Sequence, residues 1–146
     1  MELDSVAFPA IIVAADGWVE YVQTKSRLCD WTTSAVRKYS KCRVLIYDHF
    51  DHVWLVVSIL PRQRRNSVVR LVDAVRNPTI AIEVQVQAVV GTPIETVRDA
   101  LLTAIEADDD ILTQNLDASE LKVAIQKASS FEAVVQVLRT ARAIEV

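Results

Sequence analysis

The chain has 146 residues and a mass of 16.3 kDa, which is enough for one domain with its own buried core. Hydrophobic residues make up 51% of the sequence and charged residues 24%, with only two glycines and four prolines. This composition excludes disordered, collagen-like and low-complexity proteins. We therefore expect a single globular domain over residues 1–146.

The sequence predicts neither a membrane span nor a secretory signal. No apolar run approaches the roughly 20 residues that a bilayer-crossing helix needs. The first residues, MELDSVAF, include two acidic side chains and lack the basic segment that opens a signal peptide. We expect a cytoplasmic protein that does not bind a membrane.

Charge is distributed unevenly along the chain. Residues 1–78 carry 11 basic and 8 acidic side chains, whereas residues 79–146 carry 5 basic and 11 acidic ones, and the formal net charge is −3. The acidic half would repel the phosphates of a nucleic acid and suits a basic protein partner. The arginines of residues 62–76 lack the interleaved aromatic side chains that stack bases. We therefore expect no nucleic-acid partner.

The N-terminal part of the chain predicts a β-hairpin followed by a helical stretch. Residues 8–15 form an apolar run short enough for a buried strand, and Asp16-Gly17 is a turn signal because both residues tolerate positive φ. Residues 18–23 alternate between the two faces of a second strand. Residues 25–40 are polar, with loosely spaced apolar side chains that predict one or two short helices.

Two further strands are expected at residues 43–47 and 53–60, joined by the turn Asp48-His49-Phe50-Asp51-His52. Both are apolar on both faces, which indicates strands in the middle of a sheet or beneath helices. Pro61 ends the second strand because it has no N–H to donate to a neighbouring strand. Residues 67–76 fit either a short helix or part of a strand.

The clearest strand pattern covers residues 79–90. Isoleucine, valine or alanine occupies every even position up to Val90, whereas Glu83, Gln85 and Gln87 fall on the opposite face. Alternation of period two predicts a long antiparallel strand with one solvated face.

The last third of the chain is predicted to be helical, with three helix starts. Thr92-Pro93-Ile94-Glu95 is a capping box with proline at the first helical position. Asp117 with Glu120 and Ser129 with Glu132 mark the other two starts, and apolar side chains recur at helical spacing behind each. Strands followed by helices indicate an α+β fold. We expect a mostly antiparallel sheet of about five strands in the N-terminal two-thirds, packed with two to three C-terminal helices.

Two groups of residues are candidate contacts for a protein partner. One is the acidic run after the first C-terminal helix, Glu106, Asp108, Asp109 and Asp110. Because carboxylates are unfavourable at a helix C-terminus, the helix is predicted to end near residue 107, leaving either a solubilising loop or a patch that docks onto a cationic surface. The other is Trp18, which shares a strand face with Glu20 and is therefore expected to be partly exposed.

Other reactive side chains suggest metal binding or catalysis, which the sequence pattern does not favour. The turn at residues 48–52 holds two histidines and two aspartates, but no further ligand cluster lies nearby in sequence, so an ordinary turn is the favoured interpretation. A small hydrolase that uses His49 or His52 with a bound metal is the alternative. Cys29 and Cys42 are too few for a disulfide-stapled scaffold and are predicted to be buried free thiols. No metal or cofactor is expected.

Several segments together resemble a known type of protein. They are the motif Asp16-Gly17-Trp18-Val19-Glu20-Tyr21-Val22, then Leu28-Cys29 with Ala35, the strand pair at 43–59, and the stretch 121–138 with Ala128-Ser129-Ser130-Phe131 between two helices. In this order they resemble the small bacterial immunity proteins encoded beside polymorphic toxins, including those of contact-dependent growth-inhibition systems. The resemblance implies a non-enzymatic cytosolic protein that binds one toxin domain and blocks it.

From the resemblance and the acidic second half, we expect an immunity protein that binds a cognate protein toxin, expected to be a nuclease, as a monomer or homodimer. Immunity residues vary between relatives, so the resemblance assigns no binding residue by motif. The alternative is a self-associating structural or scaffold subunit without catalysis, in which the strand at residues 79–90 pairs edge to edge with that of another copy.

Overall fold

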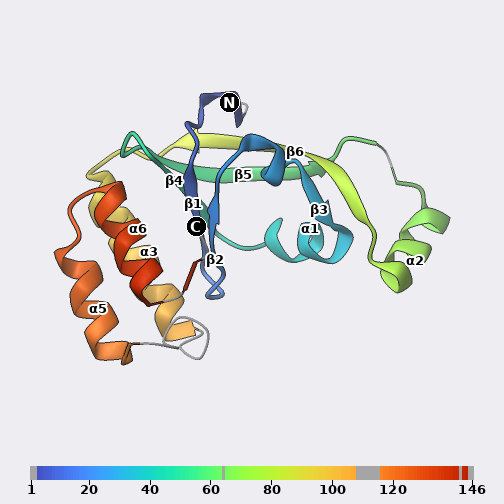
Figure 1. Ribbon diagram of the computed structural model, residues 1–146. Helices are drawn as coiled ribbons and strands as arrows, with labels where there is room; N and C mark the ends of the chain where they lie inside the picture. Colours follow the sequence, from blue (N-terminus) through green and yellow to red (C-terminus); the bar gives the residue numbers. More distant parts are fainter. Residues whose placement is uncertain (1–2, 64, 108–115, 142, 145–146) are drawn as a thin grey trace.

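The computed structural model describes residues 3–63, 65–107, 116–141 and 143–144. These residues form an α+β fold built on a curled antiparallel sheet of six strands (Figure 1). The predicted fold class is confirmed, and the sheet has one strand more than the five that were expected.

The strands follow the order β2-β1-β4-β5-β6-β3 across the sheet, and every neighbouring pair is antiparallel. They are Ala10–Ala14 (β1), Val19–Val22 (β2), Asp30–Thr32 (β3), Val44–Asp48 (β4), Val53–Pro61 (β5) and Thr79–Ala88 (β6). Strand β4 lies in the middle of the sheet and is buried along its whole length, as its two apolar faces predict.

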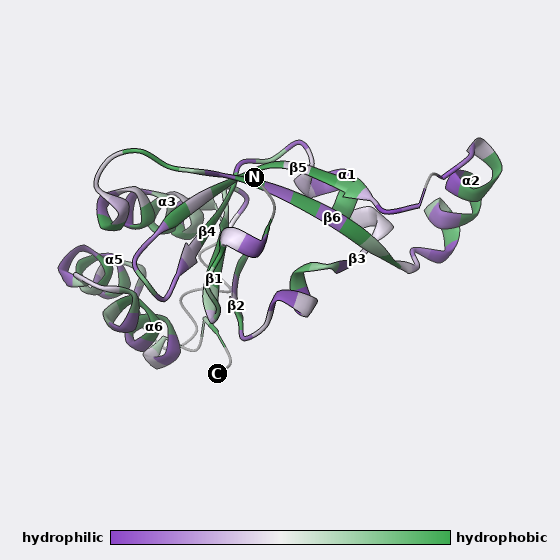
Figure 2. Ribbon diagram, turned by 90° about the horizontal axis from the view of Figure 1, so that it is seen from above, coloured by the Kyte–Doolittle hydropathy of each residue, from purple (hydrophilic) through white to green (hydrophobic). Residues whose placement is uncertain are grey.

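The described helices are α1 (Thr33–Tyr39), α2 (Ser67–Arg76), α3 (Pro93–Ala107), α5 (Ala118–Lys127) and α6 (Phe131–Thr140), with short 3-10 turns η1 (Leu3–Ser5) and η2 (Lys25–Leu28). Helices α3, α5 and α6 lie together on one side of the sheet, whereas α2 lies at the far end of the long β5–β6 pair (Figures 1 and 2). Within the described residues, none of the helices has the length and apolar character needed to cross a bilayer.

The side chains of the central strands divide the core into two layers. Ile11 and Val13 of β1 point toward α3, α5 and α6 and pack with apolar side chains such as Leu101 and Leu138. Ile12 points to the opposite face, where it shares a core with the N-terminal segment, η2, α1 and the inner sides of β5 and β6. Burial of one such aliphatic side chain stabilises the fold by roughly 2 kcal/mol.

A β-bulge in β5 keeps apolar side chains in the second layer as the sheet curls. Pairing with β6 shifts between Val56 and Ser58, so the strand gains one residue relative to its partner. Trp54 and Val56 before the bulge and Ile59 beyond it consequently pack on the same face. The curl brings β3, at one edge of the sheet, close to the second core layer.

A fully buried carboxylate, that of Asp48, organises the turn between β4 and β5. Its Oδ1 accepts hydrogen bonds from the backbone N–H groups of Phe50 and His52, both at 3.0 Å. Its Oδ2 accepts the indole N–H of Trp54 at 2.9 Å and the backbone N–H of Ala7 at 3.4 Å. One side chain thereby joins the turn, the core and the N-terminal segment.

The neighbouring Asp51 joins the same turn to the last helix. Its Oδ1 accepts the backbone N–H of Phe131, the first residue of α6, at 2.8 Å, and the hydroxyl of Tyr47 also donates to it. A carboxylate at a helix N-terminus is favourable because of the helix dipole. Burial, followed by the hydrogen bond to Asp51, raises the pKa of Tyr47 well above its usual range.

Residues 25–40, predicted to form one or two short helices, contain η2 and α1, but the strand β3 between them was not predicted. Trp31 pairs with Ile80 and Thr32 with Thr79 at the start of β6, so residues 30–32 form an edge strand between η2 and α1. The pattern of the segment itself does not reveal this strand, because it forms only through pairing with residues almost 50 positions away.

Other boundaries differ by one or two residues from those predicted. Strand β6 ends at Ala88 and Val90 is 97% exposed, so the apolar alternation extends beyond the buried part of the strand. The N-cap of α6 is Ser130, whose hydroxyl accepts the N–H of Ala133 at 3.2 Å, and not Ser129. Residues 67–76, which the sequence pattern left undecided between helix and strand, form α2.

Replacing Asp48 with alanine should lower the free energy of unfolding by about 3 kcal/mol or more, because the buried Trp54 indole N–H and three partly buried backbone N–H groups lose their acceptor. Urea denaturation followed by tryptophan fluorescence measures this loss. The control is Asp99→Ala, at an exposed position on α3, which should change the stability by less than about 0.5 kcal/mol. Equal stability of the two variants would contradict the role assigned to Asp48.

Candidate functional site

Trp18 and Glu20, both predicted contact residues, line an open cleft of about 630 Å³. Its walls come from the β1–β2 hairpin, η2, β3 and α1. The hairpin turn forms because Gly17 adopts a φ of 103°, which favours glycine, and Asp16 Oδ1 accepts the N–H of Trp18 at 3.2 Å. The turn thereby fixes Trp18 at the edge of the cleft.

Three aromatic rings contact one another inside the cleft. The ring centroids of Trp18 and Tyr39 are 4.6 Å apart, and Trp31 meets both rings edge-on at 5.6 and 5.9 Å. Trp31 is buried and held by the pairing of β3 with β6, whereas Trp18 and Tyr39 are half-buried. The exposed parts of two rings are therefore supported from beneath by a third.

Two carboxylates and one guanidinium border these rings. Glu20 is half-buried, Asp30 is exposed, and Arg27 lies 3.5 Å from Glu20 between the closest charged atoms. The side chain of Arg27 is 71% exposed, and exposed ion pairs of this kind stabilise a fold very little. A cationic group from a partner can therefore replace Arg27 beside Glu20 at small cost.

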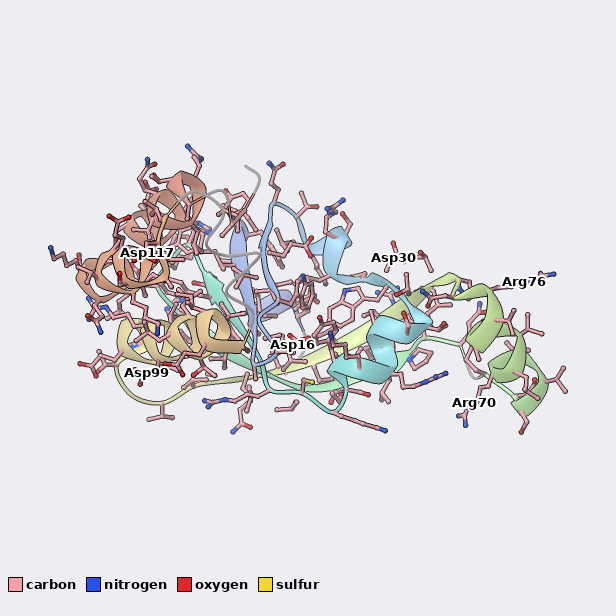
Figure 3. All side chains as sticks on the ribbon, turned by 90° about the horizontal axis from the view of Figure 1, so that it is seen from below. Asp16, Asp30, Arg70, Arg76, Asp99 and Asp117 are labelled. Carbon is pink, nitrogen blue, oxygen red and sulfur yellow. The ribbon has the colours of Figure 1, made fainter. Side chains whose placement is uncertain are left out.

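Asp16 holds the Tyr39 side chain in place through a hydrogen bond to its hydroxyl. The Tyr39 hydroxyl donates to Asp16 Oδ2 at 3.2 Å, and Lys38 Nζ lies 2.5 Å from the same oxygen. Partial burial acts to raise the pKa of Asp16, but hydrogen bonds from Lys38 and Trp18 outweigh it and hold the pKa below its ordinary value. Asp16 and Asp30 both lie in the part of the molecule between the C-terminal helices and α2 (Figure 3).

The chemistry of the cleft suits recognition of a cationic side chain. Aromatic faces attract ammonium and guanidinium groups, and carboxylates form charge-assisted hydrogen bonds with them. Partly exposed Trp and Tyr side chains are also frequent anchors of protein interfaces. The arrangement can accommodate an ammonium or guanidinium group beside the rings.

Glu106, the member of the acidic run that the structure describes, is not brought together with the cleft. Glu106 is exposed on α3, where its carboxylate lies 3.6 Å from Lys122 Nζ, and α3 covers the face of the sheet opposite to the one that carries Trp18. Asp108, Asp109 and Asp110 lie outside the described residues. Of the predicted contact residues that the structure describes, Glu106 therefore lies apart from Trp18 and Glu20.

The two aspartates of the β4–β5 turn have structural partners, whereas Nδ1 of the neighbouring His49 is buried without a hydrogen-bond partner among the described residues. The carboxylates of Asp48 and Asp51 already accept hydrogen bonds from the protein. Across the described ranges, no three His, Cys, Asp or Glu side chains are gathered as metal ligands would be. Cys29 and Cys42 are free thiols and half-buried instead of fully buried, and Cys29 donates to the carbonyl of Lys25 at 3.4 Å.

Tyr39 was not predicted as a site residue. Its position four residues after Ala35 places it on the same face of α1 as another residue of the cleft. The spacing was visible in the sequence, but β3 and its Trp31 were needed to show that this face meets the hairpin.

No family model, curated protein or solved structure matches this chain.

Asp16→Asn should lower the melting temperature near neutral pH by about 2 °C, because it removes the charge that attracts Lys38 yet keeps an acceptor for Trp18. Folding lowers the pKa of Asp16. The difference in melting temperature between the wild type and Asp16→Asn should therefore be complete above about pH 4 and disappear as the pH falls through the lowered pKa. Melting curves of both proteins, with Asp99→Asn as a control, measure this difference. An advantage that persists unchanged at about pH 2 would contradict this role of the Asp16 charge.

Proposed function

We propose that this protein is a cytoplasmic immunity protein that binds and neutralises a cognate bacterial toxin domain. The toxin is a nuclease, and the protein covers its active site or substrate surface without performing catalysis. The observation that carries this proposal is the cleft in which Trp18 and Tyr39 are partly exposed beside the carboxylates of Glu20 and Asp30.

A cationic partner follows from the chemistry of this surface. Nucleases bind phosphates through lysine and arginine, and such side chains fit an aromatic cleft with carboxylates at its border. The net negative charge of residues 79–146 would raise the rate of association with a cationic domain. The segments that resemble immunity proteins include the hairpin motif at residues 16–22, which lies in this part of the molecule.

The acidic run supplies a second proposed contact, of which the described member, Glu106, lies away from the cleft. Glu106 is exposed and paired only at 3.6 Å with a lysine, and the three aspartates that follow it are adjacent in the sequence. A toxin domain that binds both regions would have to extend around one edge of the sheet.

The alternative function, a self-associating scaffold, rests on a different surface. Strand β6 pairs with β5 along residues 82–88 and with β3 at residues 79–81, so its pairing capacity is used in part within the chain. The exposed apolar residues of α2 are the observation that favours self-association.

Co-expression with the toxin domain encoded beside this protein should yield a stable complex and protect the cells. Trp18→Ala should weaken that complex about 30-fold, because a partly buried tryptophan at an interface contributes about 2 kcal/mol or more. Calorimetric titration measures the affinity. The matched control is Phe50→Ala, an aromatic side chain that is 64% exposed on the β4–β5 turn.

Loss of toxin affinity in both variants, or in neither, would contradict the proposal that the cleft forms part of the interface. Failure of the wild-type protein to co-purify with the toxin, together with death of the cells, would contradict the proposed function itself.

Reversal of Asp108, Asp109 and Asp110 to lysine should reduce the association rate several-fold at low salt, with a smaller effect at high salt, because salt screens the long-range attraction between opposite charges. Stopped-flow mixing with the toxin at two salt concentrations measures the rate. Reversal to lysine of three other exposed acidic residues, Glu83, Glu95 and Asp99, is the control for the same change in net charge. Rates that do not depend on the reversal at either salt concentration would place the acidic run outside the encounter surface.

A further inference from the structure

A second groove, between α1, α2 and the paired ends of β5 and β6, is lined by arginine. It has a volume of about 670 Å³, and its walls include the side chains of Arg37, Arg62, Arg65 and Arg70. Asp73 is the carboxylate that lines it among the described residues. Four guanidinium groups against one carboxylate leave a formal charge of +3 in the groove, although the whole chain carries −3.

Two of the four arginines are held by contacts within the chain. Arg65 donates to both carboxylate oxygens of Asp73, at 2.9 and 2.6 Å, and Asp73 is only 6% exposed. Arg62 Nε donates to the carbonyl of Ile82 at 3.2 Å. These bonds fix two guanidinium groups at the wall of the groove, and the single carboxylate is already matched by Arg65.

Arg37 and Arg70 have no such role in the fold. Both side chains are exposed, and neither forms a hydrogen bond or an ion pair with a residue that the structure describes. Arg70 lies three residues before Asp73 on α2, and Arg37 lies four residues after Thr33 on α1, so each shares a helix face with another residue of the groove. Positive charges gathered in one concave site attract an anion.

The two helices that carry these free arginines are attached to each other. Asn77, which ends α2, accepts the backbone N–H of Ser34 through its Oδ1 at 2.9 Å. The N–H of Thr33 donates to the carbonyl of Pro78 at 3.1 Å. The walls of the groove are therefore fixed relative to each other, as in the largely preformed sites that bind small molecules.

The groove also has an apolar part. Val36 of α1, Leu60 of β5 and Ile80 of β6 line it beside the arginines. Val36 and Ile80 are half-buried, and Leu60 is 56% exposed. No aromatic side chain of the described residues lines the groove, whereas sites for single-stranded nucleic acid use aromatic rings to stack the bases. The lining therefore suits an anion that is attached to a compact apolar body.

We propose that this groove binds a small organic phosphate monoester, with its phosphate at the arginines and its apolar body on Val36, Leu60 and Ile80. A phosphate monoester carries a charge of about −2 near neutral pH and three acceptor oxygens. Guanidinium groups bind such oxygens through paired, charge-assisted hydrogen bonds. A carboxylate has one charge and is satisfied by a single guanidinium group, so it would use the groove less fully. The volume of the groove lies within the range of about 300–1,000 Å³ of small-molecule sites.

Titration of the full chain with phenyl phosphate, followed by amide NMR spectra, tests the proposal. The dissociation constant should be about 1 mM or lower at low salt, and the largest shifts should lie in α1, α2 and the adjoining ends of β5 and β6. Arg37→Ala and Arg70→Ala should each weaken binding about tenfold, because a charge-assisted hydrogen bond is lost. Both residues are exposed, so the melting temperature should not change.

The matched control is Arg76→Ala, which should bind phenyl phosphate like the wild type. Arg76 is exposed on the same helix but does not line the groove. Figure 3 shows Arg70 and Arg76 pointing in different directions. The control therefore removes the same charge from the chain without removing it from the groove.

The two parts of the ligand are tested separately. Leu60→Ser should weaken binding of phenyl phosphate about threefold, because apolar contact is lost, and should leave binding of inorganic phosphate unchanged. Arg70→Ala should weaken binding of both. Benzoate has the same ring with a singly charged carboxylate, and it should bind about fivefold more weakly than phenyl phosphate.

The proposal would be overturned by the absence of shifts with phenyl phosphate at about 20 mM, by equal loss of affinity in Arg70→Ala and Arg76→Ala, by Leu60→Ser binding phenyl phosphate like the wild type, or by benzoate binding as tightly. Tighter binding of a single-stranded oligonucleotide or of phosphatidylglycerol vesicles, at equal phosphate concentration, would also overturn it, because the ligand would then be a nucleic acid or a lipid surface. All of these titrations are made without toxin, so their outcome does not depend on the proposed function.

Discussion

The hydrogen bonds of the buried Asp48 carboxylate hold together parts of the chain that no local pattern connects. They join the β4–β5 turn, the Trp54 indole and the backbone at Ala7, and the adjacent Asp51 adds the start of α6. The register of β1 with β4 pairs Ala10 with Asp48 and Ala14 with Val44. This anchored turn therefore lies at the opposite end of the strands from the hairpin turn that carries Trp18. The rings of Trp18 and Tyr39 pack on the second core layer there and remain partly exposed.

The two proposed sites differ in chemistry and in position. The cleft combines aromatic rings with carboxylates on the second face of the sheet, whereas the groove is lined by arginines and aliphatic residues where α1 and α2 meet the end of the β5–β6 pair. They use different residues of α1, namely Ala35 and Tyr39 for the cleft and Val36 and Arg37 for the groove, so occupation of one need not block the other.

Features that depend on neighbouring residues were predictable from the sequence, and features that depend on distant contacts were not. The Asp16-Gly17 turn, the buried β4 and the helix starts follow from local chemistry. Strand β3 required pairing with Ile80, and the cleft required Trp31 and Tyr39 to meet the hairpin. The two histidines and two aspartates of the β4–β5 turn suggested metal ligands, but only the fold shows that backbone N–H groups and Trp54 occupy the carboxylates. Asn66 and Asn77 would have favoured a helix at residues 67–76, since both are good capping residues.

The central claim is that this protein acts by binding a toxin domain through the aromatic cleft. Hydrogen–deuterium exchange of the complex with the neighbouring toxin domain tests it most directly, because protection locates the bound surface on the intact chain. Slower exchange on complex formation should appear in the segments from residue 18 to residue 39, with α2 unchanged. Protection confined to other segments, or none at all in a mixture at saturating concentration, would contradict the claim.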